Sequence, residues 1–140
     1  MPLWILFSIL SAVFAALVAI LGKIGITSVD TTLATSVRAV VMAIFLVCVS
    51  LALGKGSLLS TIGNKPLLFI VLSGIAGALS WFFYFFALKT GPTSAVAALD
   101  RLSVVFVLIF ALIFLGEQFT LKSGIGALFV TIGAILMVLK

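Results

Sequence analysis

Five long apolar segments, separated by short polar stretches, run along the whole chain. Each has 19 to 23 residues, and a helix of that length rises about 30 Å, which matches the hydrocarbon core of a bilayer. The pattern therefore predicts five transmembrane helices, over residues 2–21, 32–53, 66–88, 94–115 and 121–139. Membrane strands would alternate polar and apolar residues, and these segments do not, which excludes a β-barrel.

Polar and helix-breaking residues mark the ends of these segments. Asp30, Thr31 and Thr32 are candidate N-caps of the second helix. Pro66 fits the first turn of the third helix. The short link over residues 117–120 makes the fourth and fifth helices antiparallel neighbours. Because no length remains for an extramembrane domain, we expect one all-α domain over residues 1–140, a polytopic transmembrane bundle of five helices.

The composition sharpens this prediction. Hydrophobic residues make up 65% of the chain and charged residues 8%, with a mean hydropathy of +1.55, which excludes a soluble globular domain and makes the lipid bilayer a partner. The net charge is +5, but the basic residues are scattered singly, so nucleic-acid binding is not expected. With no His and one Cys, we expect no enzyme, no metal site and no cofactor.

The lysines outside the predicted spans give no preferred orientation. They divide equally between the side of the N-terminus and the opposite side: Lys55, Lys65 and Lys122 against Lys23, Lys89 and Lys140. Without a positive-inside bias, copies inserted both ways can form an antiparallel pair, the symmetry of many secondary transporters. The alternative is that a partner protein, or a weak bias from Arg38 and Arg101, fixes one orientation.

Three ionisable residues lie within the predicted spans: Arg38, Asp100 and Arg101. Each costs roughly 2.5–3.5 kcal/mol near a helix centre and so needs a partner or an aqueous cavity. Arg38 and Asp100 lie about 10 Å from the same side, so an ion pair between them is allowed. Arg101 points about 100° away from Asp100, which leaves it to snorkel, bond to carbonyls, face a second subunit or meet an anionic substrate. A structural ion pair and a role in substrate or coupling-ion binding both stay open.

The third predicted helix carries six consecutive aromatic residues, 81–86. Trp81 reaches a depth comparable with that of Asp100, too deep for an ordinary interfacial belt. It is therefore a candidate cavity wall that can stack on a planar or cationic ligand, and Tyr84, nearer the surface, is a further pathway candidate. The four phenylalanines of the run are interpreted as a lipid-facing belt: Phe82, Phe83, Phe85 and Phe86.

Small residues recur at four-residue spacing on several of the predicted helices. The stripes are Ser8, Ala12 and Ala16 in the first, Thr35, Ala39 and Ala43 in the second, Ser73 and Gly77 in the third, and Ser123, Ala127 and Thr131 in the fifth. Such stripes let helices approach closely in lipid. We interpret them as packing seams.

Several stretches together resemble one EamA-like unit of the drug/metabolite transporter superfamily. They are GKIGI at 22–26, Arg38, the segment FFYFFALKTGPTSAVAAL at 82–99, and LGEQFTLKSGIGALFVTIGAIL at 115–136. The resemblance covers essentially the whole chain. It implies a helical transporter whose common members carry two such five-helix repeats in inverted orientation and move amino acids, nucleosides, sugars or other metabolites.

The chain departs from that pattern in two ways. It has one repeat, so the resemblance implies a dimer, either a homodimer, which can be antiparallel, or a pair with a paralogous half-transporter. Ser103 and Val104 stand where many relatives have Glu-Pro, so the acidic role is not carried over to Asp100. We expect a secondary transporter or exporter of a small metabolite in the inner (plasma) membrane, working by alternating access. The alternative is a non-transporting membrane subunit or scaffold. The candidate pathway residues are Arg38, Trp81, Tyr84, Asp100, Arg101 and Ser103.

Overall fold

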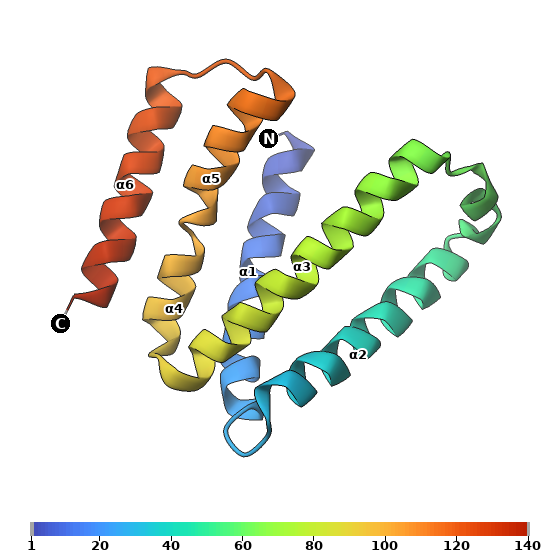
Figure 1. Cartoon of the computed structure of the whole chain (residues 1–140), viewed down its shortest axis with the longest axis horizontal. Helices are drawn as coiled ribbons and strands as arrows, with labels where there is room; N and C mark the ends of the chain where they lie inside the picture. Colours follow the sequence, from blue (N-terminus) through green and yellow to red (C-terminus); the bar gives the residue numbers. More distant parts are fainter. Residues whose placement is uncertain (1, 140) are drawn as a thin grey trace. The chain divides into compact units, whose positions relative to one another are not determined.

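The computed structural model describes residues 2–139, and this range is helical with no strand. The helices in chain order are α1 (Leu3–Gly25), α2 (Thr31–Ala52), α3 (Asn64–Thr90), α4 (Thr93–Asp100), α5 (Ser103–Phe110) and α6 (Leu121–Val138) (Figure 1). A 3-10 helix, η1 (Gly56–Thr61), lies between α2 and α3, and a π-helical turn, η2 (Ala111–Leu115), extends α5.

Five segments within the described range are long and apolar enough to cross a membrane. They are Leu3–Gly25, Thr31–Ala52, Asn64–Thr90, Thr93–Leu115 and Leu121–Val138. At most 6% of the most apolar window of each is buried within the chain, so most of these side chains are left for lipid or another protein. The prediction of an all-α chain with five membrane spans is confirmed.

The fourth span is broken near its middle, which the apolar pattern did not predict. The amide of Arg101 donates to the carbonyl of Ala98 at 3.1 Å, and the amide of Leu102 donates to that of Leu99 at 3.0 Å. These hydrogen bonds join residues three apart in the chain, as in a 3-10 helix, whereas those of an α-helix join residues four apart. The chain therefore forms one tighter turn at this point. Residues 94–115 are therefore one span but not one continuous α-helix.

Contacts between residues divide the chain into two compact units, a terminal one and a central one. The terminal unit joins α1, as far as Lys23, to the part of the chain from Thr90 onwards. In it, α6 packs against α4 and α5, and the small residues Ala127 and Ala134 of α6 are buried. The predicted seam of small residues on α6 is thus a packing surface at Ala127.

The start of α6 is fixed by a reciprocal cap. The Thr120 hydroxyl accepts a hydrogen bond from the Ser123 amide at 3.1 Å, and the Thr120 amide donates to the Ser123 hydroxyl at 3.3 Å. Two backbone amides that the helix cannot pair internally are involved in this capping box. The preceding turn, η2, ends at Gly116, which has the left-handed conformation at φ 65°.

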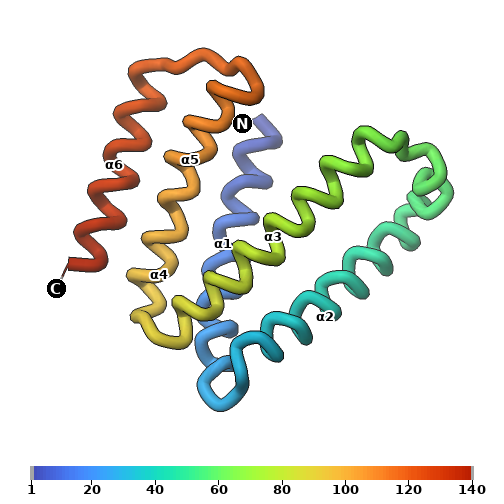
Figure 2. Tube along the Cα trace, viewed as in Figure 1, coloured from blue at the N-terminus to red at the C-terminus, as the bar shows by residue number. Residues whose placement is uncertain are grey.

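The central unit runs from Ile24 to Lys89 and contains α2, η1 and most of α3. The two helices form a hairpin whose turn contains η1 (Figure 2). The side chain of Asp30 accepts hydrogen bonds from the amides of Thr32 and Leu33 at 2.9 and 3.0 Å. Of the three candidate N-caps, Asp30 is therefore the one that starts α2.

Candidate functional site

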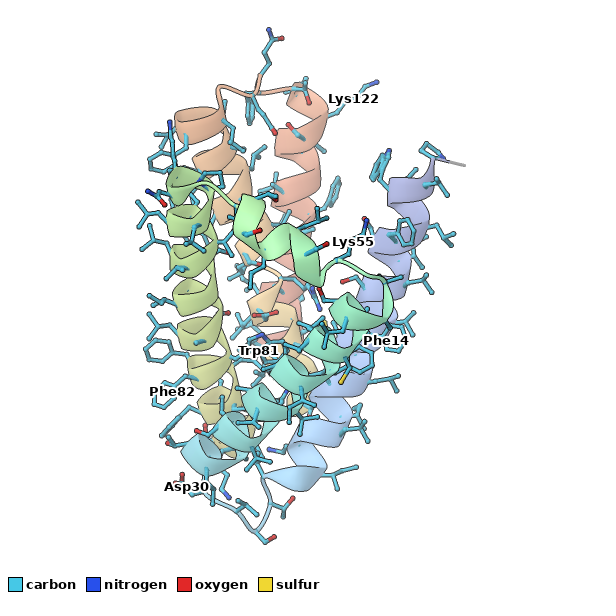
Figure 3. All side chains as sticks on the ribbon, turned by 90° about the vertical axis from the view of Figure 1, so that its right-hand side faces the viewer. Phe14, Asp30, Lys55, Trp81, Phe82 and Lys122 are labelled. Atoms are coloured by element: carbon cyan, nitrogen blue, oxygen red, sulfur yellow. The ribbon has the colours of Figure 1, made fainter. Side chains whose placement is uncertain are left out.

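The loop that precedes α2 is held by a lysine from the end of α3. The Lys89 ammonium donates to the carbonyl oxygens of Ile26, Thr27 and Val29, the latter two at 3.2 Å. Asp30, at the end of the same loop, caps α2 (Figure 3). The two ends of the α2–α3 hairpin near this loop are thus joined by polar contacts.

About two turns into α2, the Arg38 guanidinium stacks on an aromatic side chain of α3. Its central carbon lies 3.5 Å from the centroid of the Trp81 ring and 5.5 Å from that of Phe85. A separation of 3.5 Å is a contact distance for two flat groups, so the cation lies on the face of the indole. This contact gives the charge a favourable partner at a depth of about 10 Å along α2.

Trp81 is held in turn by other rings of α3. Its ring meets Tyr84 edge to face, with centroids 5.5 Å apart and planes at 80°, and lies 5.9 Å from Phe85. Phe85 is 2% exposed and its ring packs against that of Trp81, so its assignment to a lipid-facing belt is wrong. Phe83, at 66% exposure, faces away from the buried part of the chain.

A groove of about 650 Å³ lies between α2 and α3 beside this stack. Its polar residues are close together on α2: Thr32, Thr35, Ser36 and Arg38. Most of its remaining lining consists of small or apolar side chains: Ala39, Met42, Ala43, Leu46, Gly74, Gly77, Ala78, Trp81 and Phe82. We call this cavity the α2–α3 groove; Trp81 and Phe82, which line it from α3, are labelled in Figure 3.

The threonine and serine hydroxyls at the polar end donate to the backbone of their own helix. Thr35 donates to the Thr31 carbonyl at 2.7 Å, and Ser36 donates to the Thr32 carbonyl at 2.9 Å. Each hydroxyl therefore offers lone pairs, but no proton, to the groove. Arg38 is the one charged group that lines the groove.

The other sequence-predicted site residues lie in the terminal unit. Asp100 is the last residue of α4, Arg101 follows in the break, and Ser103 is the first residue of α5. Both Asp100 and Arg101 are exposed. The structure thus brings Arg38, Trp81 and Tyr84 together in one unit and leaves Asp100, Arg101 and Ser103 at one helix break. The predicted ion pair between Arg38 and Asp100 stays a prediction.

Reasoning from the sequence did not identify the small residues of α2 and α3 as groove lining. Ala39, Ala43 and Gly77 were expected in packing seams, and they line the α2–α3 groove instead. The signal was their position on the same helices as Arg38 and Trp81.

Within residues 2–139, no group of three His, Cys, Asp or Glu could hold a metal ion.

A chain whose described residues form five long apolar helical segments, each able to span a bilayer, is a multi-pass membrane protein. The family model of the EamA-like transporter family matches residues 2–139. The chain belongs to that family. It is also 40% identical over 134 residues to a Sinorhizobium protein named "Uncharacterized transporter in cobO 3'region", a match that covers 96% of this chain and 95% of that protein. No solved structure matches the chain significantly.

Proposed function

We propose that the chain is a secondary transporter or exporter of a small metabolite that works by alternating access in the inner (plasma) membrane. The observation that carries the proposal is the α2–α3 groove with Arg38 stacked on Trp81 beside it. A charge at this depth is costly unless it serves binding or has a partner. A groove of this volume is in the usual range for small-molecule sites. Membership of a transporter family supports the same conclusion.

The working unit we propose is a dimer. Secondary transporters bind substrate between two repeats and rock one against the other, whereas residues 2–139 hold a single set of five candidate spans. The partner is a second copy, which the equal lysine distribution allows to be antiparallel, or a paralogous half-transporter. We place Arg38, Trp81 and Tyr84 in the wall of the pathway and assign Asp100, Arg101 and Ser103, at the break in the fourth span, to the pathway or its coupling ion.

Transport is tested with purified protein in proteoliposomes. Metabolite pools are first screened for solutes that raise the thermal unfolding temperature, and uptake of each hit is then measured. We expect protein-dependent flux that Arg38→Gln reduces at least about tenfold, since each lost charge-assisted hydrogen bond is worth roughly 1.5–3 kcal/mol. Lys122→Gln, which removes the same charge near the start of α6, should leave the flux unchanged. If no solute binds or moves, and the chain copurifies in a fixed ratio with another membrane protein, it is a scaffold.

The arrangement of the dimer is tested by fusing a reporter to the C-terminus. Alkaline phosphatase is active outside the cytoplasm, and a fluorescent protein that folds only in the cytoplasm reports the other side. We expect signal from both fusions, since the lysines give no bias. Signal from one side alone would exclude the antiparallel homodimer and leave a parallel homodimer or a paralogous partner.

A further inference from the structure

Within the central unit, the side-chain hydrogen-bond donors of Arg38 have no protein partner. One face of the guanidinium lies on Trp81 at 3.5 Å, so the five N–H groups, which lie in the plane of the cation, point sideways from the stack. No hydrogen bond or ion pair joins the Arg38 side chain to another residue of the central unit. Arg38 lines the α2–α3 groove.

The central unit holds no carboxylate able to neutralise this cation. Its one acidic residue is Asp30, whose carboxylate caps α2 through the amides of Thr32 and Leu33. Arg38 lies eight residues further along the helix, a rise of about 12 Å, which is beyond ion-pair distance. The charge that lines the groove is therefore net positive.

The rest of the groove suits an apolar body. Ala43, Gly77 and Ala78 line it with small, uncharged side chains or bare backbone, and Met42 adds a flexible apolar side chain. The hydroxyls of the polar end are already donating to the helix backbone, so they cannot donate to an anion. The groove thus combines one planar set of strong donors with a long apolar surface.

We infer that the α2–α3 groove binds an organic carboxylate with an apolar body, its carboxylate held in the plane of the Arg38 guanidinium. Two parallel N–H to oxygen bonds match this fork to a carboxylate. A cationic ligand meets like charge at Arg38, and a zwitterion finds no carboxylate in the central unit for its ammonium group. As the identity of the transported solute, the inference rests on the proposed function; as a binding site, it stands by itself.

The test uses the fluorescence of Trp81 in the full chain. The protein has two tryptophans, Trp4 and Trp81, so Trp4→Phe leaves Trp81 as the reporter beside the cation. This protein, in nanodiscs of phosphatidylcholine, is titrated with 4-phenylbutyrate, with its neutral amide and with 4-phenylbutylamine. We expect a saturable change with the carboxylate. Binding of the amide and the amine should be weaker by about 10- to 100-fold, which corresponds to about 1.4–2.8 kcal/mol, the size of a charge-assisted hydrogen bond.

Variants then locate the site. Arg38→Gln should abolish the response, Arg38→Lys should weaken it about tenfold because the ammonium cannot form the bidentate contact, and Lys122→Gln should not change it. Equal binding of carboxylate and amide overturns the inference without any variant, even if Arg38→Gln does not fold. Unchanged affinity in folded Arg38→Lys and Arg38→Gln overturns it as well.

Two further measurements distinguish this inference from lipid binding in the groove and from the proposed transport function. A carboxylate is also present in phosphatidylserine, so nanodiscs containing that lipid are compared. A Trp81 response to phosphatidylserine with none to 4-phenylbutyrate would assign the groove to lipid and overturn the inference. Binding of 4-phenylbutyrate without flux of any solute would refute the proposed transport alone. Flux of a cation that is insensitive to Arg38→Gln would leave transport in place and refute both the role of Arg38 in the pathway and the carboxylate as the transported solute.

Discussion

The stack of Arg38 on Trp81 predicts a measurable coupling between the two side chains. Arg38→Met removes the charge and keeps an unbranched stem, and Trp81→Leu removes the ring. At 3.5 Å between the guanidinium carbon and the ring centroid, with Arg38 half-buried, we expect a coupling free energy of about 1–2 kcal/mol. This corresponds to a factor of about 5 to 30 in the unfolding equilibrium.

A double-mutant cycle is required because each single substitution also changes other terms. Arg38→Met removes a charge that is costly in lipid, and Trp81→Leu also removes the contacts with Tyr84 and Phe85. The difference between the two Trp81→Leu effects, measured with Arg38 and with Met at that position, cancels these terms. Unfolding by sodium dodecyl sulfate in mixed micelles, followed by circular dichroism, supplies the four free energies.

Phe83→Leu gives the matched control for this cycle. Phe83 is an exposed aromatic residue of the same helix, and its ring contacts that of Phe82 at 5.6 Å between centroids. Its effect should add to that of Arg38→Met within about 0.5 kcal/mol. A coupling for Trp81 no larger than that for Phe83 would refute the stack as a source of stability.

Three further predictions concern local structure and use the same unfolding assay. Lys89→Met removes the ammonium held by three loop carbonyls and should lower stability by about 1–2 kcal/mol; no loss would show that these bonds are offset by water. Asp30→Ala removes the cap of α2 and should cost about 1 kcal/mol, most of which Asp30→Asn should restore. Gly116→Ala places a side chain at φ 65° and should cost about 1 kcal/mol, whereas Gly126→Ala, with open space at its Cβ and a helical backbone, should not destabilise. Equal effects of the two alanines would contradict the conformational argument.

The membrane spans could be predicted because their signal is long and uniform. An uninterrupted apolar run of about 20 residues specifies a spanning helix whatever its neighbours are. Asp30 could be named as a cap because an acidic side chain before an apolar run satisfies free amides. The break at Arg101 and Leu102 carries no such mark, since neither residue is a helix breaker and the change is one of hydrogen-bond spacing. The π-helical turn over Ala111–Leu115 is hidden in the same way.

Reasoning from the sequence could predict how deep each site residue lies along its helix, but not which residues of other helices it faces. Counting residues places Arg38 and Trp81 at depth, and the cost of a charge in lipid marks Arg38 as in need of a partner. Counting does not give the rotation of one helix against another, so it could not identify Trp81 as a partner of Arg38. For the same reason it could not distinguish a seam of small residues from a groove at Ala39, Ala43 and Gly77.

The expected ion pair and the inferred carboxylate site require the same atoms of Arg38. Its face is occupied by Trp81, so Asp100 and a bound organic acid would both use the N–H edge. If Asp100 holds that edge nine-tenths of the time, the apparent affinity for 4-phenylbutyrate is reduced about tenfold. Asp100→Asn should then tighten binding by that factor, while Asp100→Glu, which keeps the charge, should not. Unchanged affinity in Asp100→Asn would refute the ion pair and leave Arg38 to the ligand alone, with its stack on Trp81 as the partner that keeps the cation in the membrane.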